Sequence, residues 1–166
     1  MAIKGRVWKY GDDINTDVIY PGKYTYTIID PKEMAEHALE DLDPDFVKNV
    51  QPGDIIVAGK NFGCGSSREQ AATCVKYAGV GAVVAKSFSR LYFRNAINVG
   101  LPLVQCPEAV DHIEPGEVIT IDFEKGELTC KAGTFTFPPM PEFVLEIIKD
   151  GGLIPHVKKQ IAEGKL

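Results

Sequence analysis

Residues 59–69 bring together the residue types that bind and transform a small anion. They read GKNFGCGSSRE, with three glycines, two serines and an arginine. Glycine lets the backbone approach a ligand closely and adopt positive φ. A helix predicted to begin at Arg68 would place its free N–H groups and the positive end of its dipole beside the serines. Because the Arg68 guanidinium can also hold a carboxylate bidentately, this loop is predicted to bind a carboxylate.

Helix capping is the simpler interpretation of the same residues. Ser66 with Glu69, or Ser67 with Gln70, has the spacing of a capping box. Capping would account for one serine, but not for three glycines, a second serine and an arginine in one turn. We therefore favour a ligand site in which capping is an additional role.

Other catalytic patterns do not fit the sequence. A phosphate-binding P-loop needs a lysine after its last glycine, and Gly65 is followed by serine. A nucleophile elbow needs a glycine after its serine, which is absent here. The histidines show no spacing that suggests a triad, and we expect one of them, His37, to be a surface residue.

The cysteines do not predict a metal site. Cys64, Cys74, Cys106 and Cys130 are widely separated and form no CxxC pair. Neither a zinc ribbon nor an iron–sulfur cluster bound by this chain alone is therefore indicated. We expect most of these thiols to be small buried side chains, with Cys64, between two glycines, as the exception.

The elements around the loop predict a mixed α/β fold. A strand over 54–58, the glycine loop, a helix over 68–78 and a strand over 82–85 form a βαβ unit with parallel strands. Residues 116–137 alternate like an antiparallel meander, which makes the second half rich in β-structure. The other expected elements are an edge-type strand at 3–9, a helix whose apolar face runs from Met34 to Leu42, a strand at 103–106, and helices at 89–99, 142–149 and 153–162.

Composition limits the classes of protein to which the chain can belong. With 166 residues and 45% hydrophobic residues, the chain can bury a core as a single domain over 1–166. Its net charge of −5 disfavours nucleic-acid binding, which needs a basic face. No apolar run approaches the roughly 20 residues of a membrane span, and no secretory signal is apparent. We therefore expect a cytoplasmic protein without a membrane partner.

Four collinear motifs give the sequence a family resemblance. GKNFGCGSSRE is similar to the signature of the small subunit of 3-isopropylmalate dehydratase and of the swivelling C-terminal domain of aconitases. The resemblance continues in GDDINTD at 11–17, FRNAINVGLP at 93–102 and GGL at 151–153. It implies a single swivelling β/β/α domain, as in the aconitase C-terminal domain.

The resemblance also implies roles for the residues of the loop. Ser66 matches the serine that acts, as an alkoxide, as the base at the carbon next to a carboxylate. Ser67 and Arg68 match contacts to the substrate carboxylate. Helix N–H groups and Arg68 would stabilise the Ser66 anion by the same physics that binds a carboxylate.

Two further motifs contribute residues that match the family. Asp17 matches an acidic active-site residue that orients its partners, although an Asx turn in a polar loop would equally suit it. Arg94 and Asn95 also match a recurrent motif. We expect these two to be structural, because a helix packed beside the site loop needs fixed polar contacts.

The resemblance implies a reaction and a partner. The family dehydrates a 2-hydroxy acid and rehydrates it at the neighbouring carbon, using a [4Fe-4S] cluster as Lewis acid. The cluster's cysteine ligands belong to a large subunit. This chain would therefore bind no cofactor itself and would be an active hydro-lyase only with that subunit.

The resemblance implies that the stretch after the YPGKY turn faces the variable side group of the substrate. Homoaconitase small subunits carry an arginine there, whereas residues 24–27 read YTYT. An unpaired buried carboxylate is costly, so an aliphatic group, such as the isopropyl of isopropylmalate in leucine biosynthesis, suits the site better than a third carboxylate. Tyr26 is nonetheless not the plain aliphatic residue that such a group would lead us to expect. A related substrate (a methylated malate, citraconate or homoaconitate) stays open, as does Tyr26 as a surface-packed aromatic. A non-catalytic module that binds small carboxylates is the other alternative.

Overall fold

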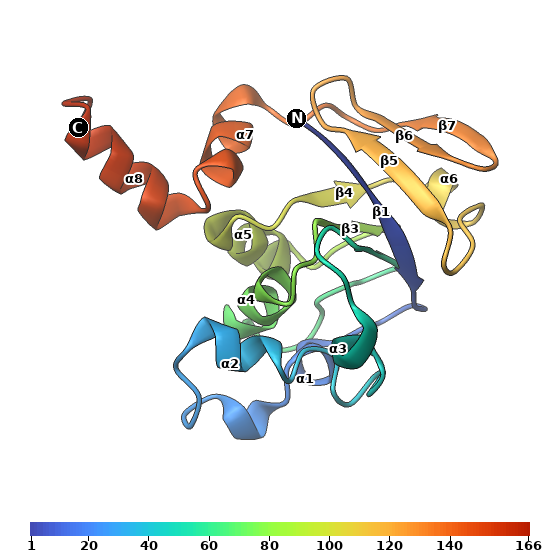
Figure 1. Ribbon diagram of the computed structural model, residues 1–166, viewed down its shortest axis with the longest axis horizontal. Helices are drawn as coiled ribbons and strands as arrows, with labels where there is room; N and C mark the ends of the chain where they lie inside the picture. Colours follow the sequence, from blue (N-terminus) through green and yellow to red (C-terminus); the bar gives the residue numbers. More distant parts are fainter.

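The computed structural model describes residues 1–166 and contains a seven-stranded sheet (Figure 1). Its strands are β1 (Ala2–Lys9), β2 (Ile55–Ala58), β3 (Ala82–Ala85), β4 (Leu103–Gln105), β5 (Val118–Asp122), β6 (Glu127–Cys130) and β7 (Gly133–Thr136). They lie in the order β4-β3-β2-β1-β5-β6-β7. The strands β4 to β1 are parallel to one another, and β1, β5, β6 and β7 pair antiparallel. The predicted βαβ unit and the predicted meander are both confirmed.

Strand β1 lies at the centre of the sheet, so its expected edge position is wrong. Val7 pairs with Ile55 of β2 on one side, and Gly5 pairs with Ile119 of β5 on the other. The alternation along β1 arises because one of its faces is less buried than the other. An alternating pattern reports which face of a strand is wet and carries no information about whether its two edges are paired.

Eight α-helices and one 3₁₀ turn surround the sheet. They are α1 (Thr16–Ile19), η1 (Gly22–Tyr24), α2 (Pro31–Ala35), α3 (Phe46–Asn49), α4 (Gln70–Tyr77), α5 (Arg90–Val99), α6 (Pro107–Val110), α7 (Glu142–Lys149) and α8 (Leu153–Ala162). The predicted helices over 142–149 and 153–162 are confirmed. Helix α8 has no buried residue and extends away from the sheet (Figure 1). No helix is both long and apolar enough to cross a membrane.

The helix expected to run as far as Leu42 is shorter than predicted. Helix α2 ends at Ala35, and the chain continues in turns. Leu39 has a φ of 57°, which no residue inside a right-handed helix adopts. Its N–H donates instead to the carbonyl of Ile19, at 2.8 Å. A tertiary contact therefore replaces the helical bond that the apolar spacing favoured.

The parallel strands are buried on both faces, and each face contributes to a separate core. Ile56 and Val83 face a cluster formed with α2, α4 and α5. Ile55 and Val84 face a second cluster, which is formed with β5, β6, α6 and α7. Figure 1 shows α2, α4 and α5 on one side of the parallel strands and the curled meander on the other. The loop between β2 and α4 therefore leaves a strand that cannot shift toward either side without disturbing a core.

The glycine loop itself is packed against α5. Gly63 has a φ of 82°, and a Cβ built there would overlap the ring of Tyr92. Tyr92 cannot move aside freely, because it is 2% exposed and its hydroxyl donates to the carbonyl of Ala71 at 3.0 Å. Gly63 is thus required both for its backbone conformation and for its lack of a side chain.

We expect Gly63→Ala to lower the free energy of unfolding by about 2–4 kcal/mol, from positive-φ strain plus overpacking. Gly116→Ala is a matched control, because Gly116 also has a φ of 82° but has no atom within 4 Å of a built Cβ. Urea denaturation of both variants measures the difference, which reports the clash with Tyr92. Equal losses in the two variants would show that the close approach to Tyr92 has no energetic weight.

Candidate functional site

The motif at 11–17 lies along one side of the glycine loop and is joined to it through the backbone. The N–H of Gly63 donates to the carbonyl of Ile14 at 2.8 Å. The N–H of Thr16 donates to the carbonyl of Cys64 at 2.9 Å. Two motifs that are distant in the sequence are therefore adjacent in space, and together they form the rim of the site.

A third segment, which connects β3 to α5, lies along the other side of the loop. The N–H of Phe62 donates to the carbonyl of Ser87 at 3.1 Å, and the N–H of Ser89 donates to that of Phe62 at 3.0 Å. The glycine loop is thus hydrogen-bonded on both sides through main-chain atoms. The positions of the serines that follow the loop are set by this pairing.

The Arg68 guanidinium contacts the segment 16–25, which contains α1 and η1. Its Nη2 donates to the carbonyls of Thr16 and Tyr20, at 2.8 and 2.6 Å, and to Oδ1 of Asp17 at 3.1 Å. Its Nη1 donates to Oγ1 of Thr25 at 3.3 Å. The side chain is 13% exposed, and its buried Nε has no partner. The arginine predicted to bind a carboxylate therefore also fixes the loop that carries Asp17.

The two serines do not cap the helix, so that expectation is wrong. Helix α4 begins at Gln70 instead of at Arg68, and its N-cap residue, Glu69, makes no capping bond. Both serines lie upstream of the position from which a side chain reaches the first helical N–H groups. Ser66 and Ser67 are exposed, and the Ser66 hydroxyl bonds to no atom of the chain. The backbone N–H groups of Ser67, Arg68 and Glu69 also meet no acceptor.

Asp17 and Asn95 both reach this loop. The Asx turn of the 11–17 motif is made by Asn15, whose Oδ1 accepts from the N–H of Asp17 at 2.9 Å. The Asp17 carboxylate is exposed and pairs with Arg68. Asn95 of α5 donates through Nδ2 to Oγ of Ser67, at 3.4 Å. This bond is a polar contact between the helix and the site loop, as expected for the structural role of Asn95.

Tyr26 projects from the loop beside the site. Its side chain is 95% exposed, so the alternative of an aromatic packed on the surface is wrong. The preceding residue, Thr25, holds this loop to the buried guanidinium. Tyr24 is the residue that packs, because it stacks on His37 at 4.0 Å and donates to Glu40 at 3.2 Å. His37 is half-buried rather than free on the surface, and its hydrogen bond lowers the pKa of the Glu40 carboxyl.

The thiols are arranged largely as expected. Cys64 is half-buried in the glycine loop, whereas Cys74, Cys106 and Cys130 are buried, and none forms a disulfide. Burial raises the pKa of the Cys74 and Cys106 thiols, which keeps them protonated and unreactive. Nowhere do three His, Cys, Asp or Glu side chains converge in a way that could hold a metal ion.

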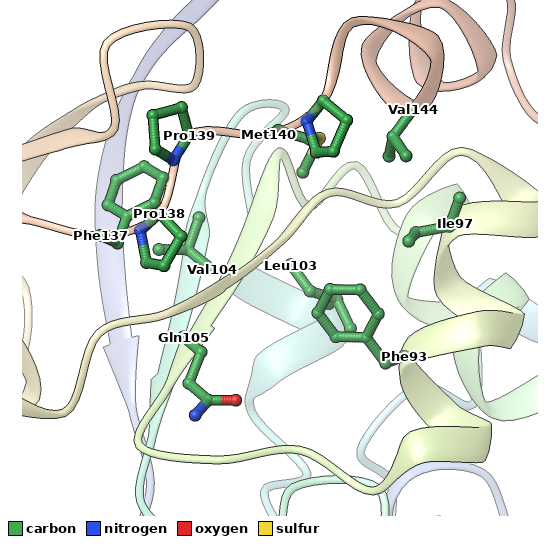
Figure 2. Close-up of a pocket in the computed structure, with 11 residues that line it drawn as sticks. Phe93, Ile97, Leu103, Val104, Gln105, Phe137, Pro138, Pro139, Met140 and Val144 are labelled. Carbon is green, nitrogen blue, oxygen red and sulfur yellow. The ribbon is translucent and has the colours of Figure 1, made fainter.

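An apolar pocket of about 480 Å³ lies elsewhere, between α5, β4 and the segment leading to α7 (Figure 2). Phe93 and Ile97 of α5 line one side, and Phe137 lies with the following prolines on the other. Gln105 is the single polar side chain that lines it. Without a charged group, this pocket does not suit a substrate that carries carboxylates.

Known proteins resemble this chain over almost its whole length. A family model described as the aconitase C-terminal domain matches residues 12–108. The 3-isopropylmalate dehydratase small subunit of Heliobacterium modesticaldum is 51% identical over 99% of this chain and 100% of its own length. That of Caldicellulosiruptor bescii is 53% identical over 97% of this chain and 98% of its own.

A solved structure agrees with these sequence matches. The crystal structure of 3-isopropylmalate dehydratase from Methanocaldococcus jannaschii superposes with a TM-score of 0.91 and 44% identity, over 99% of this chain and 98% of that one. The expected aconitase-type α/β fold is therefore confirmed. With this fold and with such identity over full-length relatives, the chain belongs to the 3-isopropylmalate dehydratase small-subunit family, which carries the aconitase C-terminal domain.

Proposed function

We propose that this chain supplies the base and the carboxylate-binding loop of a hydro-lyase that interconverts 2-isopropylmalate and 3-isopropylmalate in leucine biosynthesis. The observation that carries the proposal is the free hydroxyl of Ser66 beside backbone N–H groups that have no acceptor. A capping serine would have its oxygen engaged by the helix. The relatives named as small subunits of this dehydratase support the same reaction.

Ser66 is the proposed base. A free serine hydroxyl is far too weak an acid to exist as an alkoxide, so its surroundings must stabilise the anion. The N–H groups of Ser67, Arg68 and Glu69 can do so, together with the positive end of the α4 dipole. The guanidinium of Arg68 adds a permanent positive charge. The resulting alkoxide removes the proton from the carbon next to the substrate carboxylate and returns one during rehydration.

Ser67 and Arg68 are the proposed contacts of that carboxylate. Nη2 of Arg68 donates to three acceptors within the chain, whereas Nη1 has one acceptor and Nε has none. Because Nε is buried, the unused N–H of Nη1 is the group available to a carboxylate. Asp17 orients the guanidinium through its ion pair of 3.1 Å. In this arrangement, the Arg68 side chain links substrate binding to the position of the segment 16–25.

A large subunit that carries a [4Fe-4S] cluster is the proposed partner. The donor set of this chain does not fit such a cluster, because three of its thiols are buried and no ligands converge. The cluster would supply the Lewis acid for the leaving hydroxyl from the partner subunit. Relatives that are named small subunits support this division between two chains.

The setting of the complex is also a proposal. Four free cysteines are typical of a reducing compartment, which supports a cytoplasmic location. The net charge of −5 supports a small-molecule substrate rather than nucleic acid. One sheet joins both halves of the chain, which supports a single domain over residues 1–166.

We expect Ser66→Ala to reduce kcat by roughly 10²–10⁴-fold, the scale of a lost general base, with little change in KM. Ser67→Ala is the control in the same turn, and it should weaken binding more than chemistry. Because neither serine caps α4, both variants should keep the thermal midpoint of the wild type. The measurement is kcat, KM and melting temperature in the reconstituted two-subunit enzyme. A similar small loss of kcat in both variants would remove Ser66 as the base.

We expect Arg68→Lys to raise KM and lower kcat, because a point charge cannot replace the fork that binds a carboxylate and the loop together. Arg6→Lys is the matched control, since Arg6 also donates to a backbone carbonyl and a carboxylate, those of Asn49 and Asp54. Steady-state kinetics of both variants test the difference. Unchanged constants for Arg68→Lys would move this arginine out of the site.

We expect Tyr26→Arg to shift preference toward substrates that carry an added distal carboxylate, through a new charge-assisted pair. Phe143→Arg, at an apolar side chain on α7 that is 66% exposed, controls for the added surface charge. Competition between isopropylmalate and homologues with a further carboxylate measures the ratio of kcat/KM. If that ratio is the same in the two variants, the loop does not face the substrate.

A further inference from the structure

Thr16 makes three contacts with the loop that carries the proposed base. Its N–H donates to the carbonyl of Cys64 at 2.9 Å, and its own carbonyl accepts from Nη2 of Arg68 at 2.8 Å. Its hydroxyl donates to the carbonyl of Ser66, also at 2.9 Å. Thr16 is 2% exposed, so these bonds are formed on the buried side of the loop.

The hydroxyl bond determines how the following peptide is oriented. A trans peptide is planar, and its carbonyl and N–H point in opposite directions. Because Thr16 holds the carbonyl of Ser66 from the buried side, the N–H of Ser67 is directed toward the exposed side, where it has no acceptor. This peptide could otherwise turn about ψ of Ser66 and φ of Ser67, and the bond from the Thr16 hydroxyl opposes that rotation.

We propose that Thr16 is a positioning residue, whose hydroxyl fixes the Ser66–Ser67 peptide so that the Ser67 N–H and the Ser66 hydroxyl are presented together to the substrate. This inference rests on the proposed role of Ser66 as the base. Thr16 itself touches neither the substrate nor the reacting atoms. Its effect is to hold one donor of the alkoxide-stabilising group in place before the substrate binds, which lowers the cost of organising the site.

Two substitutions separate the hydroxyl from the shape of Thr16. Thr16→Val keeps the branched shape and removes the donor, whereas Thr16→Ser keeps the donor. Thr73→Val is the matched control, because Thr73 is 9% exposed and its hydroxyl also donates to a backbone carbonyl, that of Glu69, at 3.1 Å. The two valine variants lose the same kind of bond, on the two sides of Arg68.

The experiment measures kcat, KM and melting temperature of these variants, and of Ser66→Ala, in the enzyme reconstituted with its large subunit. We expect Thr16→Val to lower kcat by about 10- to 100-fold, as for a small misplacement of a reacting group, with KM almost unchanged. Thr16→Ser should restore kcat to within a few-fold of wild type. Thr73→Val should lower the melting temperature as Thr16→Val does and leave kcat unchanged.

The outcomes distinguish this inference from the proposed function. Full activity of Thr16→Val, while Ser66→Ala is inactive, would overturn the positioning role and leave the base in place. Equal losses of kcat in Thr16→Val and Thr73→Val would also overturn it. If Ser66→Ala is fully active, the base and the positioning role fail together. Should Thr16→Val not fold, Thr16→Ala removes the same hydroxyl without an added methyl group, and the same comparisons apply.

Discussion

The pairing of the glycine loop with a main-chain segment on each side is the constraint on which the site depends. Gly63 bonds to the 11–17 motif, and Phe62 bonds to the segment before α5. These bonds use backbone atoms, so they do not depend on the exposed side chains of Ser66 and Ser67. The loop begins at the end of β2, which is buried on both faces and contributes to both cores. A shift of this strand would therefore expose part of a core.

Arg68 turns this backbone framework into a site of defined shape. Its guanidinium binds the segment 16–25 to the glycine loop, because it donates to two carbonyls, a carboxylate and a hydroxyl of that segment. Most of the contacts of the arginine are therefore internal, and a substrate would complete a set of donors that is already partly used. The arrangement favours preorganisation, since the charge is fixed before any ligand arrives.

Local patterns predicted those parts of the molecule that local forces determine. The βαβ unit, the meander and the two C-terminal helices follow from alternation, helical spacing and turn residues within each segment. The central position of β1 and the early end of α2 did not follow, because both depend on contacts with distant strands or loops. For the site, glycine, serine and arginine types were informative. Thr16 was missed, because its importance lies in the backbone carbonyl that its hydroxyl meets.

The 24–27 stretch differs from the rest of the site in how it is attached. It takes no part in the pairing of the glycine loop, and Thr25 joins it to Arg68 through one hydroxyl at 3.3 Å, while the side chain of Tyr26 stands free. Substitutions at Tyr26 therefore carry little risk to folding. Under the proposed roles, a change at Tyr26 would alter which side group is accepted and would leave Ser66, the proposed base, in place. Selectivity could then vary without a change in the proton transfer.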